Sequence, residues 1–343
     1  MELASSFEFG GVCIQPGKRA TVELPMARLY TNNVMSLPVQ VLHGRNRGPV
    51  LFVSAAVHGD EINGVEIIRR ILISRHLAQL RGTLLAIPVV NPFGFIQRSR
   101  YLPDRRDLNR SFPGTAKGSS AGRLAHMFMT KIVNRCDFGI DLHTGSNFRS
   151  NFPQIRACLD DPNTIKFASA FGAPIVVPSE LREGSLREVV ADLGKPILVY
   201  EGGESLAFNE TVIRTGVKGI LKSMRYLGML PPNHKDKHLT PIITDQTSWV
   251  RASMSGTFSL KVKLGDFVRK GDLLGILSNP FGSDQEEVRA PFTGMNIGQL
   301  NLPLAHEGDA LIHLAKIPCP EDGECVPKES PSPLTEDDFG LVR

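Results

Sequence analysis

The sequence predicts an α/β fold, in which a mostly parallel sheet carries helices on both faces, followed by a small all-β domain. From residue 50 to about 228, apolar strand-like runs alternate with helical patterns, which implies right-handed crossovers between parallel strands. Four apolar runs, at 51–57, 84–90, 138–142 and 196–200, are each followed by a polar residue, as expected of buried central strands. After residue 248 only short strand-like segments separated by glycines remain, which predicts the second domain.

The elements follow one another in a simple order along the chain. Short β-type runs at 21–24 and 37–42 predict an antiparallel edge that leads into the main sheet. Apolar residues recur at helical spacing within 62–77, 119–133 and 211–227, which predicts three helices. We therefore divide the chain into a main domain at 1–230, a linker at 231–248, a small β domain at 249–316 and a Pro-rich, acidic tail at 317–343.

Composition excludes several classes of protein. The formal net charge of +4 is too small to indicate a nucleic-acid partner, and no apolar run approaches the roughly 20 residues needed to cross a bilayer. The N-terminus has no basic segment followed by an apolar one, so no secretory signal is visible. Five cysteines without a Cys-x-x-Cys pair favour reduced thiols in a cytoplasmic protein.

Polar residues at the ends of the predicted strands suggest a metal site. His58 and Glu61 follow the first run, at a strand-to-helix turn, and His143 follows the third. Because the carboxyl ends of parallel strands meet at one edge, we expect these side chains to lie together. Two histidines and one carboxylate are the ligand set of hydrolytic zinc sites, which leave a fourth position open for water. Each histidine alone is more often a satisfied polar residue, so the hypothesis depends on the joint pattern.

Acidic and basic residues near the same edge suggest hydrolysis. Glu201 follows the fourth run and could take the proton of a metal-activated water, with Glu204 as the competing candidate. Five arginines lie within 98–110. Arginine suits bidentate recognition of carboxylate, so one could hold a substrate carboxylate while another polarises a carbonyl. A phosphate substrate is the weaker alternative, because no Gly-rich phosphate loop accompanies these arginines.

The predicted small β domain contains two similar segments. Residues 250–258 and 288–294 both run from a basic residue through alanine to glycine, and this pattern resembles the barrels of lipoyl and biotinyl carriers. In those carriers a lysine at the tip of a hairpin holds the cofactor. The corresponding connection, 278–285, contains no lysine, which argues against a carried lipoyl or biotin.

Four motifs together resemble the succinylglutamate desuccinylase/aspartoacylase family, which belongs to the wider zinc carboxypeptidase-like fold. They are His-Gly-Asp-Glu at 58–61, Asp-Leu-Asn-Arg at 107–110, Asp-Leu-His-Thr-Gly at 141–145, and Glu201. The resemblance covers roughly 40–230. It implies one zinc ion per chain, held by His58, Glu61 and His143, with Glu201 as general base.

The same resemblance assigns roles to the arginine segment. It implies that Asn109 and Arg110 bind the substrate, and it makes Arg100, within Arg-Tyr, the residue that polarises the carbonyl. The spacing from Arg100 to Asn109 is slightly longer than in aspartoacylase, so Arg105 and Arg106 remain rivals.

The sequence thus predicts a zinc-dependent hydrolase that cleaves the amide bond of an N-acyl amino acid. A metallocarboxypeptidase acting on peptide C-termini is the alternative enzyme, and a catalytically inactive binding protein is the alternative outside enzymes. The expected partner is a small-molecule substrate, with no nucleic acid and no membrane. The acyl group, the amino acid and the formation of a homo-oligomer all remain open.

Overall fold

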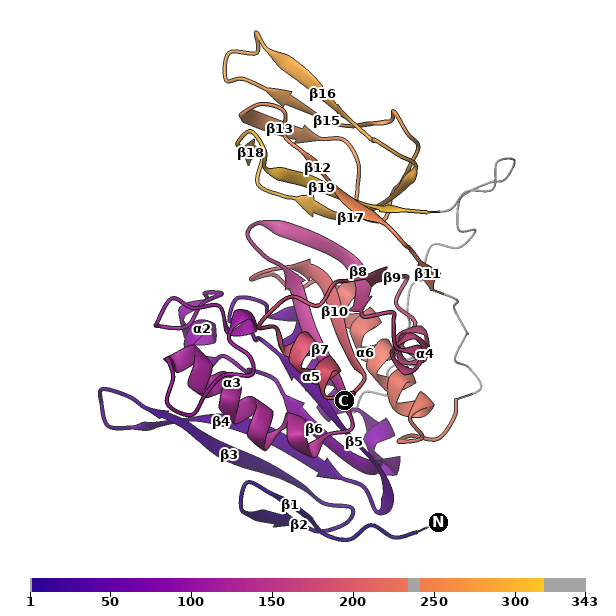
Figure 1. Ribbon diagram of the computed structural model, residues 1–343. Helices are drawn as coiled ribbons and strands as arrows, with labels where there is room; N and C mark the ends of the chain where they lie inside the picture. Colours follow the sequence, from indigo (N-terminus) through magenta and orange to yellow (C-terminus); the bar gives the residue numbers. More distant parts are fainter. Residues whose placement is uncertain (1, 234–240, 318–343) are drawn as a thin grey trace.

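Four parallel strands form the centre of the molecule in the computed structural model, which describes residues 2–233 and 241–317 (Figure 1). They are β5 (Asn46–Ala55), β6 (Arg81–Ile87), β7 (Phe138–Gly145) and β10 (Ile197–Glu204), in the order β6-β5-β7-β10. Each corresponds to one of the four predicted apolar runs, and all neighbouring pairs are parallel. The prediction that their carboxyl ends share one edge is therefore confirmed.

The whole sheet is mixed, which differs from the mostly parallel sheet that we predicted. β3 (Arg19–Arg28) and β4 (Val34–His43) form an antiparallel hairpin beside β6, as the N-terminal runs indicated. On the other side, β8 (Arg149–Ala157) returns antiparallel to β10, and β9 (Ile175–Pro178) pairs in parallel with β8. The connection from β7 to β8 is too short for a parallel crossover, which needs a dozen or more residues, so β8 reverses direction.

Helices cover both faces of the sheet, as predicted (Figure 1). α1 (Asn63–Leu72), α4 (Pro162–Phe171) and α6 (Glu210–Tyr226) pack on one face, and α3 (Ser120–Lys131) and α5 (Leu186–Asp192) on the other. The predicted helix at 62–77 ends early, because Ser74 caps a separate 3-10 helix, Arg75–Gln79. The short helices α2 (Pro92–Gln97), α4 and α5 were not predicted.

The hydrophobic core lies in two layers, one on each side of the central strands. Successive residues of β5 point to opposite faces, so Leu51 and Val53 join the layer under α1 and α6, whereas Phe52 joins the layer under α3. The Phe52 ring meets that of Phe128 edge to face, with centroids 5.9 Å apart. No helix within the described residues is long and apolar enough to cross a membrane.

The C-terminal region continues the main sheet. Residues 247–316 contain strands and no helix: β12 (Thr247–Arg251), β13 (Gly256–Leu260), β14 (Phe267–Val268), β15 (Leu273–Ser278), β16 (Gln285–Arg289), β17 (Gly294–Leu300), β18 (Leu304–Ala305) and β19 (Ala310–Lys316). β17 pairs antiparallel with β8, so β17, β19 and β12 extend the large sheet, while β13, β15, β16 and β18 form a second one. The predicted small β domain and the predicted main domain thus share a continuous sheet.

The remaining elements are short. They are the hairpin β1 (Phe7–Phe9) and β2 (Val12–Ile14), the 3-10 helices Leu108–Arg110 and Val133–Arg135, and β11 (Ile242–Ile243). β11 pairs with β9, so part of the predicted linker belongs to the main sheet. Residues 234–240 of that linker, and all but the first residue of the predicted tail, lie outside the described residues.

Candidate active site

The first two candidate ligands lie in the turn between β5 and α1. His58 follows the end of β5 by three residues, and Glu61 lies just before α1 begins. The turn packs closely against α2, because a Cβ built on Gly59 would lie 1.9 Å from the carbonyl carbon of Gly94. Glycine is therefore required at this position. The close approach fixes the path of the chain from His58 to Glu61.

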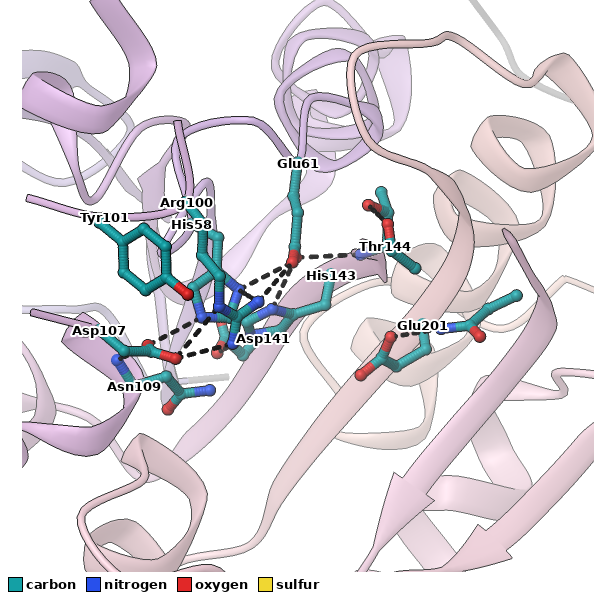
Figure 2. Close-up of polar contacts among 12 residues, drawn as sticks. His58, Glu61, Arg100, Tyr101, Asp107, Asn109, Asp141, His143, Thr144 and Glu201 are labelled. Atoms are coloured by element: carbon teal, nitrogen blue, oxygen red, sulfur yellow. Dashed lines mark hydrogen bonds and ion pairs between the residues drawn. The ribbon is translucent and has the colours of Figure 1, made fainter. Parts of the chain in front are cut away.

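His58, Glu61 and His143 come together, and we call them the ligand triad (Figure 2). All three are buried, and one candidate ligand atom of each lies within 4.8 Å of the others. Glu61 lies between the histidines: Nδ1 of His58 is 2.8 Å from Oε1, and Nδ1 of His143 is 2.8 Å from Oε2. Both Nδ1 atoms therefore face the same carboxylate, as three ligands of one cation would.

Carboxylates on the opposite side of each imidazole hold the two rings in place. Nε2 of His58 is 3.1 Å from Oδ1 of Asp107, and Nε2 of His143 is 2.7 Å from Oδ2 of Asp141. Ser54 in turn donates a 2.7 Å hydrogen bond to Asp141. A carboxylate behind a metal-ligating histidine is the usual outer shell of a zinc site, because it orients the ring and raises its basicity. The donor set and its support therefore fit a zinc ion.

The charges of the ligand triad are strongly coupled. Burial alone would raise the pKa of Glu61, but His58 and His143 hold the pKa well below its usual range. Burial alone would lower the pKa of His143, yet Asp141 and Glu61 hold it well above the usual histidine range. Glu61 is thus kept as the anion that a cation requires. The histidines must lose their protons to bind a metal, so metal binding would release protons.

Arg100 is the arginine of the 98–110 segment that contacts the ligand triad. Its Nη1 lies 3.2 Å from Nδ1 of His58 and 3.5 Å from Oε1 of Glu61, while its Nη2 donates a 2.8 Å bond to Asp107. The rival residues Arg105 and Arg106 are exposed. The geometry therefore favours Arg100, rather than Arg105 or Arg106, for a role beside the ligand triad.

Asn109 and Arg110 lie beside α5. The Asn109 side-chain oxygen accepts a 2.9 Å bond from the backbone N–H of Leu186, at the start of that helix. Arg110 is exposed and lines a surface pocket of about 530 Å³ together with Glu183 and Glu188. Its guanidinium is thus accessible, which a residue that binds a substrate carboxylate requires.

Glu201 and Glu204 have different surroundings. Glu201 is paired with His143 in the β10–β7 register, and its Oε2 accepts a 2.8 Å bond from Nδ2 of Asn151 on β8. Figure 2 shows Glu201 beside the ligand triad, with no drawn contact to its three residues. Glu204 instead accepts hydrogen bonds from Ser150, at 3.1 Å, and from Asn301. The carboxylate of Glu204 is therefore engaged in hydrogen bonds that link β8 to the C-terminal region.

Several residues around Glu201 carry no signal in the sequence. Arg156 on β8 has its Nε 3.9 Å from Oε1 of Glu201, and Arg187 on α5 is 8% exposed. Neither Nε has a hydrogen-bond partner among the described residues. Burial, together with the charge of Arg156, lowers the pKa of Arg187 to about 10. No local motif marks these arginines, because β8 and α5 bring them together from distant parts of the chain.

Comparison with known proteins identifies the family. The model of the succinylglutamate desuccinylase/aspartoacylase catalytic domain matches residues 47–227, which is more than half of the chain. The chain belongs to the succinylglutamate desuccinylase/aspartoacylase family. The matched residues of this family member run from β5 to α6 and contain the ligand triad, the arginine segment and Glu201. β17 and the other C-terminal strands lie beyond them.

Individual relatives agree with this assignment. The N-alpha-acetyl-L-2,4-diaminobutyric acid deacetylase of Halomonas elongata is 27% identical over 252 residues, which are 69% of this chain and 72% of the relative. The product-bound ectoine utilization protein EutE of Ruegeria pomeroyi is 25% identical, with a TM-score of 0.77 over 87% of this chain and 94% of that one. A succinylglutamate desuccinylase/aspartoacylase structure from Rhodobacter sphaeroides has a TM-score of 0.78 at 23% identity, over 92% of this chain and 100% of that one, which supports the shared fold.

Proposed function

We propose that this protein is a zinc-dependent deacylase that hydrolyses the amide bond of an N-acyl amino acid. The observation that carries the proposal is the ligand triad, whose two histidines direct Nδ1 at Glu61 and are backed by Asp107 and Asp141. Membership of the family supports it, as does the relative named as an N-acetyl-diaminobutyric acid deacetylase.

The metal and the protein would divide the chemistry between them. One zinc ion, held by His58, Glu61 and His143, would supply an activated water and polarise the amide carbonyl. Glu201 accepts the proton of the attacking water and returns it to the leaving nitrogen. Arg100 lies at the metal edge and donates to the oxygen that becomes negatively charged during attack.

Asn109 and Arg110 bind the α-carboxylate of the substrate. Arg110 presents an exposed guanidinium, whose planar donors match a carboxylate in a bidentate manner. Asn109 is held by its bond to the N-terminus of α5, which orients its own side chain. Substrate held there would be positioned by charge before the reaction begins.

The arginines beside Glu201 favour a substrate that carries a second carboxylate. Arg156 and Arg187 place positive charge in a partly buried region in which Glu201 is a nearby anion. Nη2 of Arg187 donates to Ser179 and to the backbone oxygen of Glu180, but the buried Nε atoms of both arginines have no hydrogen-bond partner among the described residues. Because an unpaired buried donor is costly, an anionic ligand would stabilise this arrangement. The second carboxylate would lie on the acyl group or on the amino-acid side chain. A substrate with a cationic side chain, such as the diaminobutyric acid of the Halomonas relative, would be disfavoured.

The position of the C-terminal strands favours small substrates over peptides. The C-terminal strands are joined to β8 immediately beside Glu201, through the pairing of Gly298 with Asn151. An open groove for a long peptide is more typical of metallocarboxypeptidases, which remain the alternative enzyme. An inactive binding protein would have no need of Glu201 beside a complete ligand triad.

A hydrolysis panel tests the proposal. Zinc-loaded protein is incubated with N-acetylaspartate, N-succinylglutamate, N-acetyl-diaminobutyrate and a dipeptide, and the free amine is measured. We expect turnover of one of the two substrates that carry extra carboxylates, a higher KM for it in Arg156→Met, and no change in the surface control Arg123→Met. Preference for the cationic N-acetyl-diaminobutyrate would contradict the proposal that the substrate carries a second carboxylate. Hydrolysis of the dipeptide alone would favour a carboxypeptidase.

A further inference from the structure

We propose that Asn151 is a positioning residue for Glu201, and that the C-terminal strand β17 holds Asn151 in place. The general base would then depend on a part of the chain outside the matched catalytic domain, 47–227. The inference rests on the proposed role of Glu201 as general base, and it adds a requirement that this role does not itself contain.

The contact between the two side chains defines which carboxylate oxygen is free. Asn151 is buried, and its amide Nδ2 donates a 2.8 Å hydrogen bond to Oε2 of Glu201. Oε1 carries no hydrogen bond among the described residues and lies 3.9 Å from Arg156. Fixing Oε2 as an acceptor leaves Oε1 to receive the proton of the attacking water. A carboxylate held in one orientation would avoid the entropy loss of ordering it during the reaction.

Irregularities in the pairing of β10 and of β17 lie next to Asn151. The β10–β8 register shifts between Glu201 and Gly203, and Gly203 has a φ of 73°, which suits glycine. β17 has a shift of its own between Asn296 and Gly298. Bulges of this kind re-aim side chains beside active sites. Asn151 is the cross-strand partner of both Gly203 on β10 and Gly298 on β17, the residues at which these two shifts end.

Gly298 forms the contact with Asn151 from the C-terminal side. The two residues are cross-strand partners, and a Cβ built on Gly298 would lie 3.1 Å from Oδ1 of Asn151 and 3.2 Å from Cβ of His313. Both separations are tighter than ordinary van der Waals contact. A side chain at Gly298 would therefore push on the amide that holds Glu201.

Further bonds keep β8 in this register. Nε2 of Gln154 donates a 3.1 Å bond to the backbone oxygen of Ile297, and the backbone N–H of Asn301 donates a 2.8 Å bond to the oxygen of Phe148. Asn301 also bonds the side chain of Ser150. These contacts join β8 to β17 and to Asn301, just after β17. They leave Asn151 little freedom to turn away from Glu201.

A double-mutant cycle tests whether Asn151 acts through Glu201. We measure kcat, KM and zinc content for wild type, Asn151→Ala, Glu201→Gln and the double variant, on the substrate that wild type turns over fastest. Removing a hydrogen bond to a charged group should lower kcat roughly 10- to 100-fold in Asn151→Ala, with KM and zinc content near wild type. In the Glu201→Gln background the same change should have almost no further effect, because the group that it positions is already disabled.

Two further variants separate positioning from folding. Gly298→Ala should also lower kcat, less than Asn151→Ala, and should not add to it in the double variant. Asn279→Ala is the control, since the amide nitrogen of this side chain bonds Ser283 and Asp284 in the turn between β15 and β16, away from β8 and β17; its kcat should match wild type. Asn151→Asp keeps the shape of the side chain but replaces the donor, and it should lose as much kcat even if Asn151→Ala does not fold.

Each outcome of the cycle bears on a different claim. If the losses of kcat in Asn151→Ala and Glu201→Gln multiply in the double variant, the positioning role is overturned, while the proposed deacylase function stands. A rise in KM alone, or an equal loss in Asn279→Ala, would overturn it as well. Full activity of Glu201→Gln would show that Glu201 is not the general base, and would therefore overturn this proposal as well. Absence of turnover by wild type on every substrate would overturn the proposed function itself.

Discussion

At the scale of single residues, the two candidate bases can be separated by their neighbours. Glu204 is bonded to Ser150 and Asn301, whereas Glu201 faces Asn151 and Arg156 near the ligand triad. Glu201→Gln keeps the size of the side chain but cannot accept the proton, so kcat should fall by roughly 10²–10⁴-fold with zinc content unchanged. Glu204→Gln should affect kcat much less. If the larger loss occurs at Glu204, the assignment of the base is wrong.

Substitutions of the two arginines with proposed roles, Arg100 and Arg110, should change different kinetic constants. Arg100→Ala should lower kcat with little change in KM, because its partner oxygen gains charge only in the transition state. Arg110→Ala should raise KM by weakening the grip on the substrate carboxylate, a loss of roughly 1.5–3 kcal/mol. Steady-state kinetics on the preferred substrate distinguish them, with exposed Arg105→Ala as the control. Exchanged effects would refute the assignment of roles to these arginines while leaving the enzyme class standing.

The ligand triad was predictable residue by residue, whereas its surroundings were not. His58 and His143 each follow an apolar run, and a polar residue at that place is visible in the sequence alone. No such pattern identifies Asn151, Arg156 and Arg187, because their proposed roles depend on where β8 and α5 pack. Asp141 lies two residues before His143, on the same face of β7, so the period of a strand could have revealed it.

At the scale of elements, β7 carries both a proposed metal ligand, His143, and the carboxylate behind it, Asp141. Asp141 holds Nε2 of His143 at 2.7 Å and is itself bonded by Ser54 on the neighbouring strand. Asp141→Asn should keep the fold but lose the charge that strengthens the histidine, so zinc affinity should fall roughly 10- to 100-fold. Competition with a chromogenic chelator measures the affinity, and Asp137→Asn, at the other end of the strand, is the control. Equal affinities in both variants would exclude the supporting role.

Elements with strong local signals were predicted, and those fixed by distant contacts were not. The periodic patterns at 119–133 and 211–227 correspond to α3 and α6, whose N-caps Ser119 and Asn209 accept the expected backbone bonds. α5 is only seven residues long, and too few apolar positions repeat within it for a period to be recognised. The reversal of β8 follows from a short turn, which the alternation of strands and helices did not reveal.

At the scale of the whole molecule, the two parts of the chain are joined more closely than the sequence suggested. The predicted boundary near 231–248 separates two patterns of composition, yet β17 pairs directly with β8. The partners in this pairing are about 150 residues apart in the chain, and no local pattern encodes such a contact. The fold class and the ligand triad could be predicted because they depend on local periodicity. The shared sheet could not, because it depends on long-range packing.

The central claim is that the ligand triad holds the zinc ion on which hydrolysis depends. The most direct measurement strips the protein with a chelator, adds zinc back in measured amounts, and follows release of free amine from the preferred substrate. Activity should vanish in the stripped protein and return at one zinc per chain, whereas His143→Ala should neither retain zinc nor recover. Full turnover by the metal-free protein, or normal zinc content in His143→Ala, would contradict the account.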